Sequence, residues 1–75
     1  MELTKKQFAA LLNAAQSKQF PGLSNAAVAE RMGISRQLYF QYTDETEDSS
    51  WPTLPNFLKL VRHLKINVNE LVKYS

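Results

Sequence analysis

The stretch that decides the fold spans residues 25–42, with the sequence Asn25-Ala26-Ala27-Val28-Ala29-Glu30-Arg31-Met32-Gly33-Ile34-Ser35-Arg36-Gln37-Leu38-Tyr39-Phe40-Gln41-Tyr42. Ala29 is small where a second helix would have to approach closely, and Gly33 can adopt the positive φ of a tight turn. Large side chains that could fill the angle between two helices stand at Val28, Met32, Ile34, Tyr39 and Tyr42. This order of sizes predicts two short helices joined by a tight turn, a helix-turn-helix.

Working outward, turn-forming residues divide the whole chain into helical segments. Each segment begins with a side chain that can accept a hydrogen bond from a free amide of the first turn: Thr4, Ser24, Ser35, Thr53 and Asn67. We expect helices over about residues 4–18, from Ser24 to Gly33, over 35–42, from Thr53 to near Lys65, and from Asn67 onward. No segment predicts a strand. The fold class is therefore all-α, a compact bundle of four to five helices in a single domain over residues 1–75.

Apolar spacing predicts which side of each helix faces the core. The expected stripe of the first helix is Phe8, Leu11, Leu12 and Ala15, that of the third is Leu38, Tyr39 and Tyr42, and that of the fourth is Leu54, Phe57, Leu58, Val61 and Leu64. We expect the first, fourth and fifth helices to enclose the central pair. Five of the basic residues outside that pair are interpreted as solubilising surface charge: Lys5, Lys6, Lys59, Arg62 and Lys65.

Composition excludes several classes of function. The 75 residues are 44% apolar and 21% charged, as expected for one globular domain, and they include no cysteine and one histidine. Thiolate metal sites, disulfides and paired imidazole ligands are therefore absent. No nucleophile–base pair or glycine-rich phosphate loop is visible, and no apolar run is long enough to span a membrane. We expect a protein that is not an enzyme, has no cofactor and no metal, and lies in the cytoplasm.

The charge of the chain is unevenly distributed. Four of its seven acidic residues fall within residues 43–50, which contain no basic residue: Asp44, Glu45, Glu47 and Asp48. The remaining sequence carries nine Lys and Arg against three acidic residues. A basic body suits a polyanion such as nucleic acid.

The motif at residues 23–36, Leu23-Ser24-Asn25-Ala26-Ala27-Val28-Ala29-Glu30-Arg31-Met32-Gly33-Ile34-Ser35-Arg36, resembles the Xre-like helix-turn-helix domains of phage repressors and Cro proteins. Pro52-Thr53-Leu54 and Asn69-Glu70-Leu71 are similar to that family's fourth-helix and closing-helix patterns, so the resemblance covers residues 4 to about 73. It implies a lambda-repressor-like fold, and a small repressor or Cro-like transcription regulator of a bacterium or phage that binds an inverted-repeat operator.

The resemblance also implies roles for individual residues. The helix over about 35–42 would enter the major groove of double-stranded DNA, with base contacts from Arg36, Gln37, Phe40 and Gln41. Arginine can donate twice to guanine and glutamine can pair twice with adenine, while Phe40 could lie against a thymine methyl group or pack on a neighbouring helix. Asn25 and Ser35 would contact the DNA backbone.

A symmetric homodimer is expected on such an operator. The candidate dimer interface is Ile66, Val68, Val72 and Tyr74, because these apolar side chains cannot all face one small core.

The acidic segment departs from the family pattern, because it would place four carboxylates near phosphate. Three interpretations stay open: the segment points away from DNA, it contacts a basic patch on another subunit or protein, or it lowers affinity so that only a good operator binds. An alternative function follows from it, a protein-interaction module in which Asp44, Glu45, Glu47 and Asp48 dock onto a basic partner.

Overall fold

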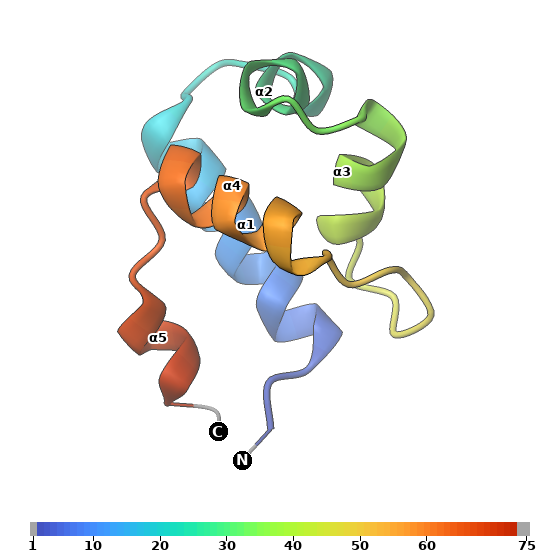
Figure 1. Ribbon diagram of the computed structural model, residues 1–75, viewed down its shortest axis with the longest axis vertical. Helices are drawn as coiled ribbons and strands as arrows, with labels where there is room; N and C mark the ends of the chain where they lie inside the picture. Colours follow the sequence, from blue (N-terminus) through green and yellow to red (C-terminus); the bar gives the residue numbers. More distant parts are fainter. Residues whose placement is uncertain (1, 74–75) are drawn as a thin grey trace.

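The computed structural model describes residues 2–73, which form five α-helices and contain no strand (Figure 1). The helices are α1 (Lys5–Gln19), α2 (Asn25–Met32), α3 (Arg36–Tyr42), α4 (Leu54–Leu64) and α5 (Val68–Val72). The expected all-helical bundle is confirmed.

The helices begin where the sequence predicts. The Thr4 hydroxyl accepts from the Gln7 amide at 3.1 Å while Gln7 Oε1 accepts from the Thr4 amide at 2.9 Å, a complete capping box. The four other expected cap residues also accept from an amide of their own first turn: Ser24, Ser35, Thr53 and Asn67. Local sequence therefore determines each helix start, because a cap satisfies a backbone amide that the helix itself leaves unpaired.

The turn between α2 and α3 depends on Gly33, which has φ 71° and ψ 29°. The Gly33 amide donates to the Glu30 carbonyl at 3.2 Å, and the Ile34 amide reaches back to the Ala29 carbonyl at 3.0 Å. This pair of bonds is the Schellman ending of a helix, which needs a left-handed residue at the position of Gly33. Ser35 then caps α3, so residues 33–35 form the turn of the predicted helix-turn-helix.

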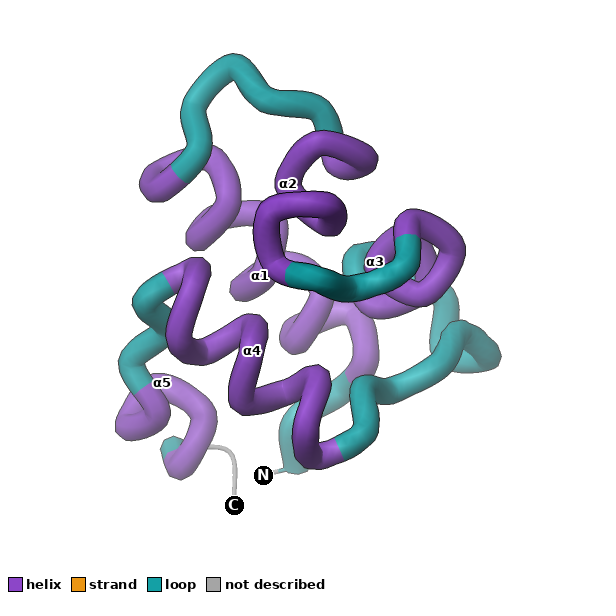
Figure 2. The backbone as a smooth tube through the Cα atoms, turned by 45° about the horizontal axis from the view of Figure 1, so that its top comes forward, coloured by secondary structure: helices purple, strands orange, loops and turns teal. Residues whose placement is uncertain are grey.

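Two helix pairs enclose the core. α1 crosses behind α4, and α2 packs against both α3 and α4, as Figures 1 and 2 show from two directions. Ala29 is completely buried at the helix-turn-helix, together with the larger core side chains Phe8, Leu12, Val28, Met32, Ile34, Tyr39, Tyr42, Leu60 and Leu64. α3 lies at one edge of the molecule, and one of its sides is left uncovered.

The predicted stripe of α1 is only partly correct. Phe8 and Leu12 are buried, but Leu11 and Ala15 lie half-buried at the edge of the core. The buried side of α1 continues instead through polar residues, Lys5 at its first turn and Gln16 near its last. Apolar periodicity missed them because it counts polar side chains as exposed.

The predicted stripe of α4 is only partly correct, because Leu64 is buried and Phe57 and Val61 are half-buried, but the two other predicted residues are exposed. Leu60 and Leu64 are buried, whereas Leu54 and Leu58 are 69% and 57% exposed. α4 carries two apolar rows, and only contacts with α1 and α2 decide which row faces inward. α5 also differs from expectation, since none of its residues is buried and it lies beside the first part of α1 without covering the α2–α3 pair (Figure 1).

Replacing Ala29 with leucine tests the α2–α3 crossing. The larger side chain would overpack a completely buried position, so we expect the free energy of unfolding to fall by about 1–3 kcal/mol in urea titration. Ala10→Leu, at an exposed position of α1, is the matched control and should change stability little. Equal stability of the two variants would contradict the close approach of α2 and α3.

Candidate nucleic-acid interface

The uncovered side of α3 carries the predicted base-contacting residues. Arg36 and Gln37 are exposed, Phe40 is 52% exposed, and Gln41 is half-buried at the end of the helix. About half of the Phe40 side chain is therefore accessible to a partner. The opposite side of α3 is anchored by the buried Tyr39 and Tyr42, whereas Leu38, predicted to face the core, is exposed. The core therefore fixes the rotation of this helix about its axis.

The C-terminal end of α3 is held by a buried lysine from α1. Lys5 is completely buried, and its Nζ donates to the carbonyl oxygens of Gln41 at 2.8 Å and Tyr42 at 3.0 Å. It also donates to the Asp44 carbonyl at 2.6 Å, where the following loop begins. Three donors of one ammonium group thus meet three carbonyls at the negative end of the helix dipole. The prediction that Lys5 is surface charge is wrong.

Burial lowers the pKa of Lys5 from its ordinary value, because desolvation disfavours the charged ammonium. The carboxylates of Asp44 and Glu47 act in the opposite direction. The three carbonyl contacts also favour the charged form, since a neutral amine has one donor fewer. Nearby carboxylates and carbonyl dipoles therefore oppose part of the desolvation cost of the ammonium group under α3.

The remaining carbonyls of this helix end also have partners. Asn13 Nδ2 on α1 donates to the Thr43 carbonyl at 3.3 Å, and the Thr43 hydroxyl donates to the Tyr39 carbonyl at 3.0 Å. No buried side-chain nitrogen or oxygen in the described residues lacks a partner. The end of α3 is consequently fixed by α1 without an αL cap of its own.

A third polar residue of α1 links both helices of the helix-turn-helix. Gln16 Oε1 accepts from the Tyr39 hydroxyl at 2.5 Å, and Gln16 Nε2 donates to Asn25 Oδ1 at 2.8 Å. Burial raises the pKa of Tyr39 to about 12, so the phenol stays a donor over the physiological range. One amide side chain thus joins the first residue of α2 to the centre of α3.

Two side chains of α4 also form hydrogen bonds with the helix-turn-helix. Asn56 Nδ2 donates to the Tyr42 hydroxyl at 2.9 Å, and Lys59 Nζ donates to the Gly33 carbonyl at 3.2 Å. Lys59, interpreted from sequence as surface charge, therefore lies against the α2–α3 turn. Polar contacts from α1 and α4 reach the turn, the centre and the end of the helix-turn-helix, and all of them avoid the outward side of α3.

The two predicted backbone-contacting residues lie at helix starts. Asn25 is the first residue of α2, and because its Oδ1 accepts from Gln16, its Nδ2 group is the part left for a phosphate. Ser35 precedes α3, and its Oγ accepts from the Leu38 amide at 3.1 Å, which leaves the hydroxyl proton for an acceptor. Both positions suit donors to a polyanion.

The acidic segment forms a folded turn. Asp44 Oδ1 accepts from the Thr46 amide at 2.9 Å, and this hydrogen bond lowers the pKa of Asp44. The Ser49 hydroxyl donates to the carbonyls of Asp44 and Thr46, which closes the turn. In Figure 1 the loop (yellow) projects from the end of α3 toward the start of α4. The carboxylates of Glu45, Glu47 and Asp48 remain exposed.

The candidate dimer residues are not equivalent in the structure. Ile66 is half-buried against the core, whereas Val68 and Val72 on α5 are exposed. Tyr74 lies outside the described residues. Ile66 therefore offers less accessible apolar surface than Val68 and Val72 do.

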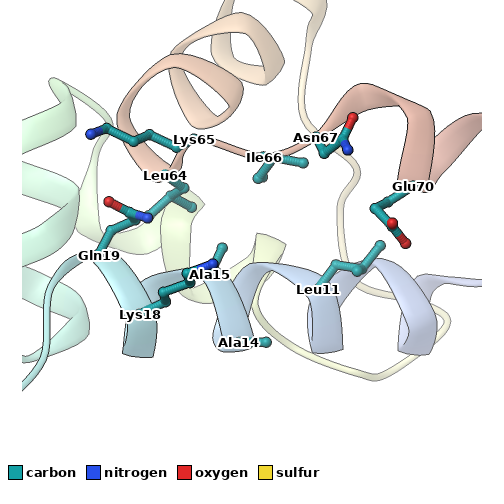
Figure 3. A pocket seen from close by; sticks show the side chains of 10 residues that line it. All are labelled: Leu11, Ala14, Ala15, Lys18, Gln19, Leu64, Lys65, Ile66, Asn67 and Glu70. Atoms are coloured by element: carbon teal, nitrogen blue, oxygen red, sulfur yellow. The ribbon is translucent and has the colours of Figure 1, made fainter.

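A shallow groove of about 260 Å³ lies between α1 and the α4–α5 junction (Figure 3). Leu11, Ala15, Leu64 and Ile66 contribute to its apolar wall. In residues 2–73 no group of three or more His, Asp or Glu side chains is placed to hold a metal ion. Over the same residues, no helix has the length and hydrophobicity needed to cross a bilayer.

Sequence reasoning missed the polar contacts that position α3. The available signal was spacing, because Lys5 and Gln16 share the helical side of Phe8 and Leu12. A lysine and a glutamine on an apolar side indicate buried polar partners, but the sequence does not show that those partners are the carbonyls and hydroxyl of α3.

Comparison with protein-family models, with curated proteins and with solved structures gave no match for this chain. The resemblance to Xre-like domains therefore stays a prediction based on the motif at residues 23–36.

Lys5→Met tests the buried ammonium. Methionine keeps a chain of similar length but leaves three carbonyls without their donor, so the free energy of unfolding should fall by about 1–3 kcal/mol. Lys6→Met removes the same charge from an exposed neighbouring position and is the control. Urea titration of both variants gives the comparison, and a Lys5 variant no less stable than the Lys6 variant would contradict the structural role.

Tyr39→Phe tests the buried phenol through pH. The folded pKa of about 12 exceeds the ordinary 10.0, so the unfolded chain releases this proton first as pH rises. The stabilisation is fully present below pH 10.0 and is lost as pH rises through about 12. We expect Tyr39→Phe to be less stable at neutral pH, by about 1 kcal/mol, and to lack this loss. If the free energy of unfolding fell equally in the wild type and in Tyr39→Phe between these pH values, the role of the buried phenol would be contradicted.

Proposed function

We propose that this chain is a sequence-specific DNA-binding transcription regulator, of the small-repressor or Cro-like kind, that reads the major groove with the outward side of α3. The observation that carries the proposal is the exposure of Arg36, Gln37 and Phe40 on a helix whose other side holds the fully buried Tyr39. Long donors on a rigidly held helix have no role in the core. They suit a ligand that presents hydrogen-bonding edges.

The dimensions and chemistry of duplex DNA fit this surface. The major groove is about 12 Å wide and admits one α-helix with its side chains. Arg36 can donate to guanine O6 and N7, while Gln37 and Gln41 can each pair with adenine N6 and N7. Phe40 offers an apolar surface to a thymine methyl group. These four side chains would read a few adjacent base pairs.

Charge supports a polyanionic partner. Outside the acidic loop, residues 43–50, the chain has nine Lys and Arg against three acidic residues. Asn25 and Ser35 add uncharged donors at the starts of α2 and α3. Phosphate contacts of this kind would fix the register of α3 in the groove, while base contacts supply sequence preference.

A single α3 reads too few base pairs to define an operator in a genome. A two-fold pair of chains doubles the site and requires an inverted repeat. We therefore propose that the chain acts as a homodimer and represses transcription by occupying the operator.

Selection of binding sites from random duplex DNA tests the proposal directly, and we expect an inverted repeat. Absence of any DNA binding at low salt, where phosphate contacts are strongest, would contradict DNA recognition and favour a protein-interaction module instead.

Alanine variants of α3 test which residues read the bases. Changing Arg36, Gln37 or Gln41 should cost about 1–3 kcal/mol on the selected operator and relax preference at one or two base pairs. Lys6→Ala, an exposed substitution on α1, controls for general loss of charge and should leave base preference unchanged. The measurement is fluorescence anisotropy with operator and single-base mismatched duplexes. If a variant with all three residues changed to alanine kept wild-type affinity and base preference, α3 would not be the helix that reads the bases.

A further inference from the structure

The outward side of α4 carries an apolar row that the fold does not use. Leu54 and Leu58 are 69% and 57% exposed, and they lie four residues apart on one side of the helix. Arg62 continues the same row one turn later and is also exposed. Leu60 and Leu64 supply the buried side of α4, so the exposed leucines contribute nothing to this core.

Charge is arranged unequally along this row. The acidic loop, residues 43–50, comes just before α4, whereas Arg62 lies near the C-terminal end of the helix. Arg62 makes no ion pair with any residue from 2 to 73. The N-terminal approach to α4 is therefore acidic, and the far end of its exposed row is basic.

This polarity is self-complementary when two α4 helices pack antiparallel. A two-fold axis placed midway between residues 54 and 58 sets Leu54 of one chain against Leu58 of the other. Arg62 then lies about 9 Å along the helix from the axis, at 1.5 Å per residue. The N-terminal end of the partner's α4 lies on that same side of the axis. The acidic loop that precedes it therefore comes near Arg62.

We infer that a second copy of this chain docks on the Leu54–Leu58–Arg62 row of α4, with the acidic loop of each copy facing Arg62 of the other. The leucines supply the apolar contact, and the exposed Glu45 and Asp48 supply opposite charge at both ends. The antiparallel arrangement also opposes the two helix dipoles favourably. The acidic loop thereby acquires a role that does not require contact with DNA.

The expected association is weak. Two helices of 11 residues cover less than the roughly 800 Å² per partner of a standard interface. The inference deepens the homodimer proposed above, but it invokes no property of DNA. The experiments that test it contain no DNA, so their failure would leave recognition by α3 to be judged by the binding-site selection.

Sedimentation of the intact chain over a range of concentrations tests the apolar contact. The wild type should show reversible association into dimers, and Leu54→Gln with Leu58→Gln should weaken it by at least about tenfold. Both positions are exposed, so unfolding is not expected, and circular dichroism verifies this. The matched control is Val68→Thr with Val72→Thr on α5, which should associate as the wild type does. Loss of association only in the α5 variant would overturn the inference, as would a wild type that stays monomeric at the highest concentration reached.

A charge exchange tests the contact between loop and helix. Glu45→Lys with Asp48→Lys in one chain, and Arg62→Glu in another, should each weaken self-association several-fold at low salt, because like charges then meet. Mixing the two variants should restore association as a heterodimer, since the two introduced lysines face the introduced glutamate and the unaltered acidic loop faces Arg62. Failure of the mixture to associate more tightly than either variant alone would overturn the proposed pairing.

Discussion

The contact on which the position of α3 depends is the ammonium group of Lys5 beneath the carbonyls of Gln41, Tyr42 and Asp44. Burying an ammonium group costs free energy, and here the carbonyl dipoles and nearby carboxylates offset part of that cost. A hydrophobic contact could hold α3 against the core without fixing where the helix ends. Three directed hydrogen bonds fix the end, the following loop and hence the orientation of the exposed side.

Other polar contacts also hold the helix-turn-helix in position. Gln16 joins α2 to α3 through Asn25 and Tyr39, while α4 contacts the turn through Lys59. Each contact uses a backbone carbonyl or a buried side-chain group of the helix-turn-helix. The outward donors of α3 are consequently left unpaired, as the proposed contact with the edges of bases requires. A rigid helix also lowers the entropic cost of binding, because its side chains start from a fixed frame.

The two apolar rows of α4 show how a small domain can use one helix twice. Leu60 and Leu64 complete the core, and Leu54 and Leu58 remain exposed. In a chain of 75 residues a large share of the surface stays accessible, so an exposed row of this kind is available for contact with another molecule. The acidic loop joins α3 to α4, and it connects the surface proposed for DNA with the surface proposed for a second copy.

The sequence by itself determined the local features of this protein. The caps Thr4, Ser24, Ser35, Thr53 and Asn67 and the left-handed Gly33 predicted the helices and the turn, because these effects act within four residues along the chain. The sequence also indicated that the donors of α3 face outward, since Tyr39 and Tyr42 occupy its other side.

Only the tertiary structure decided the burial of Lys5 and the exposed phase of α4. Lys5 meets carbonyls 36 to 39 residues away, and no local pattern marks a backbone carbonyl as a partner. Along α4, Leu54 and Leu58 are as apolar as Leu60 and Leu64, so periodicity allowed either row to face inward. Packing against α1 and α2 selected one row, because an interior can be filled densely by only one side of a helix.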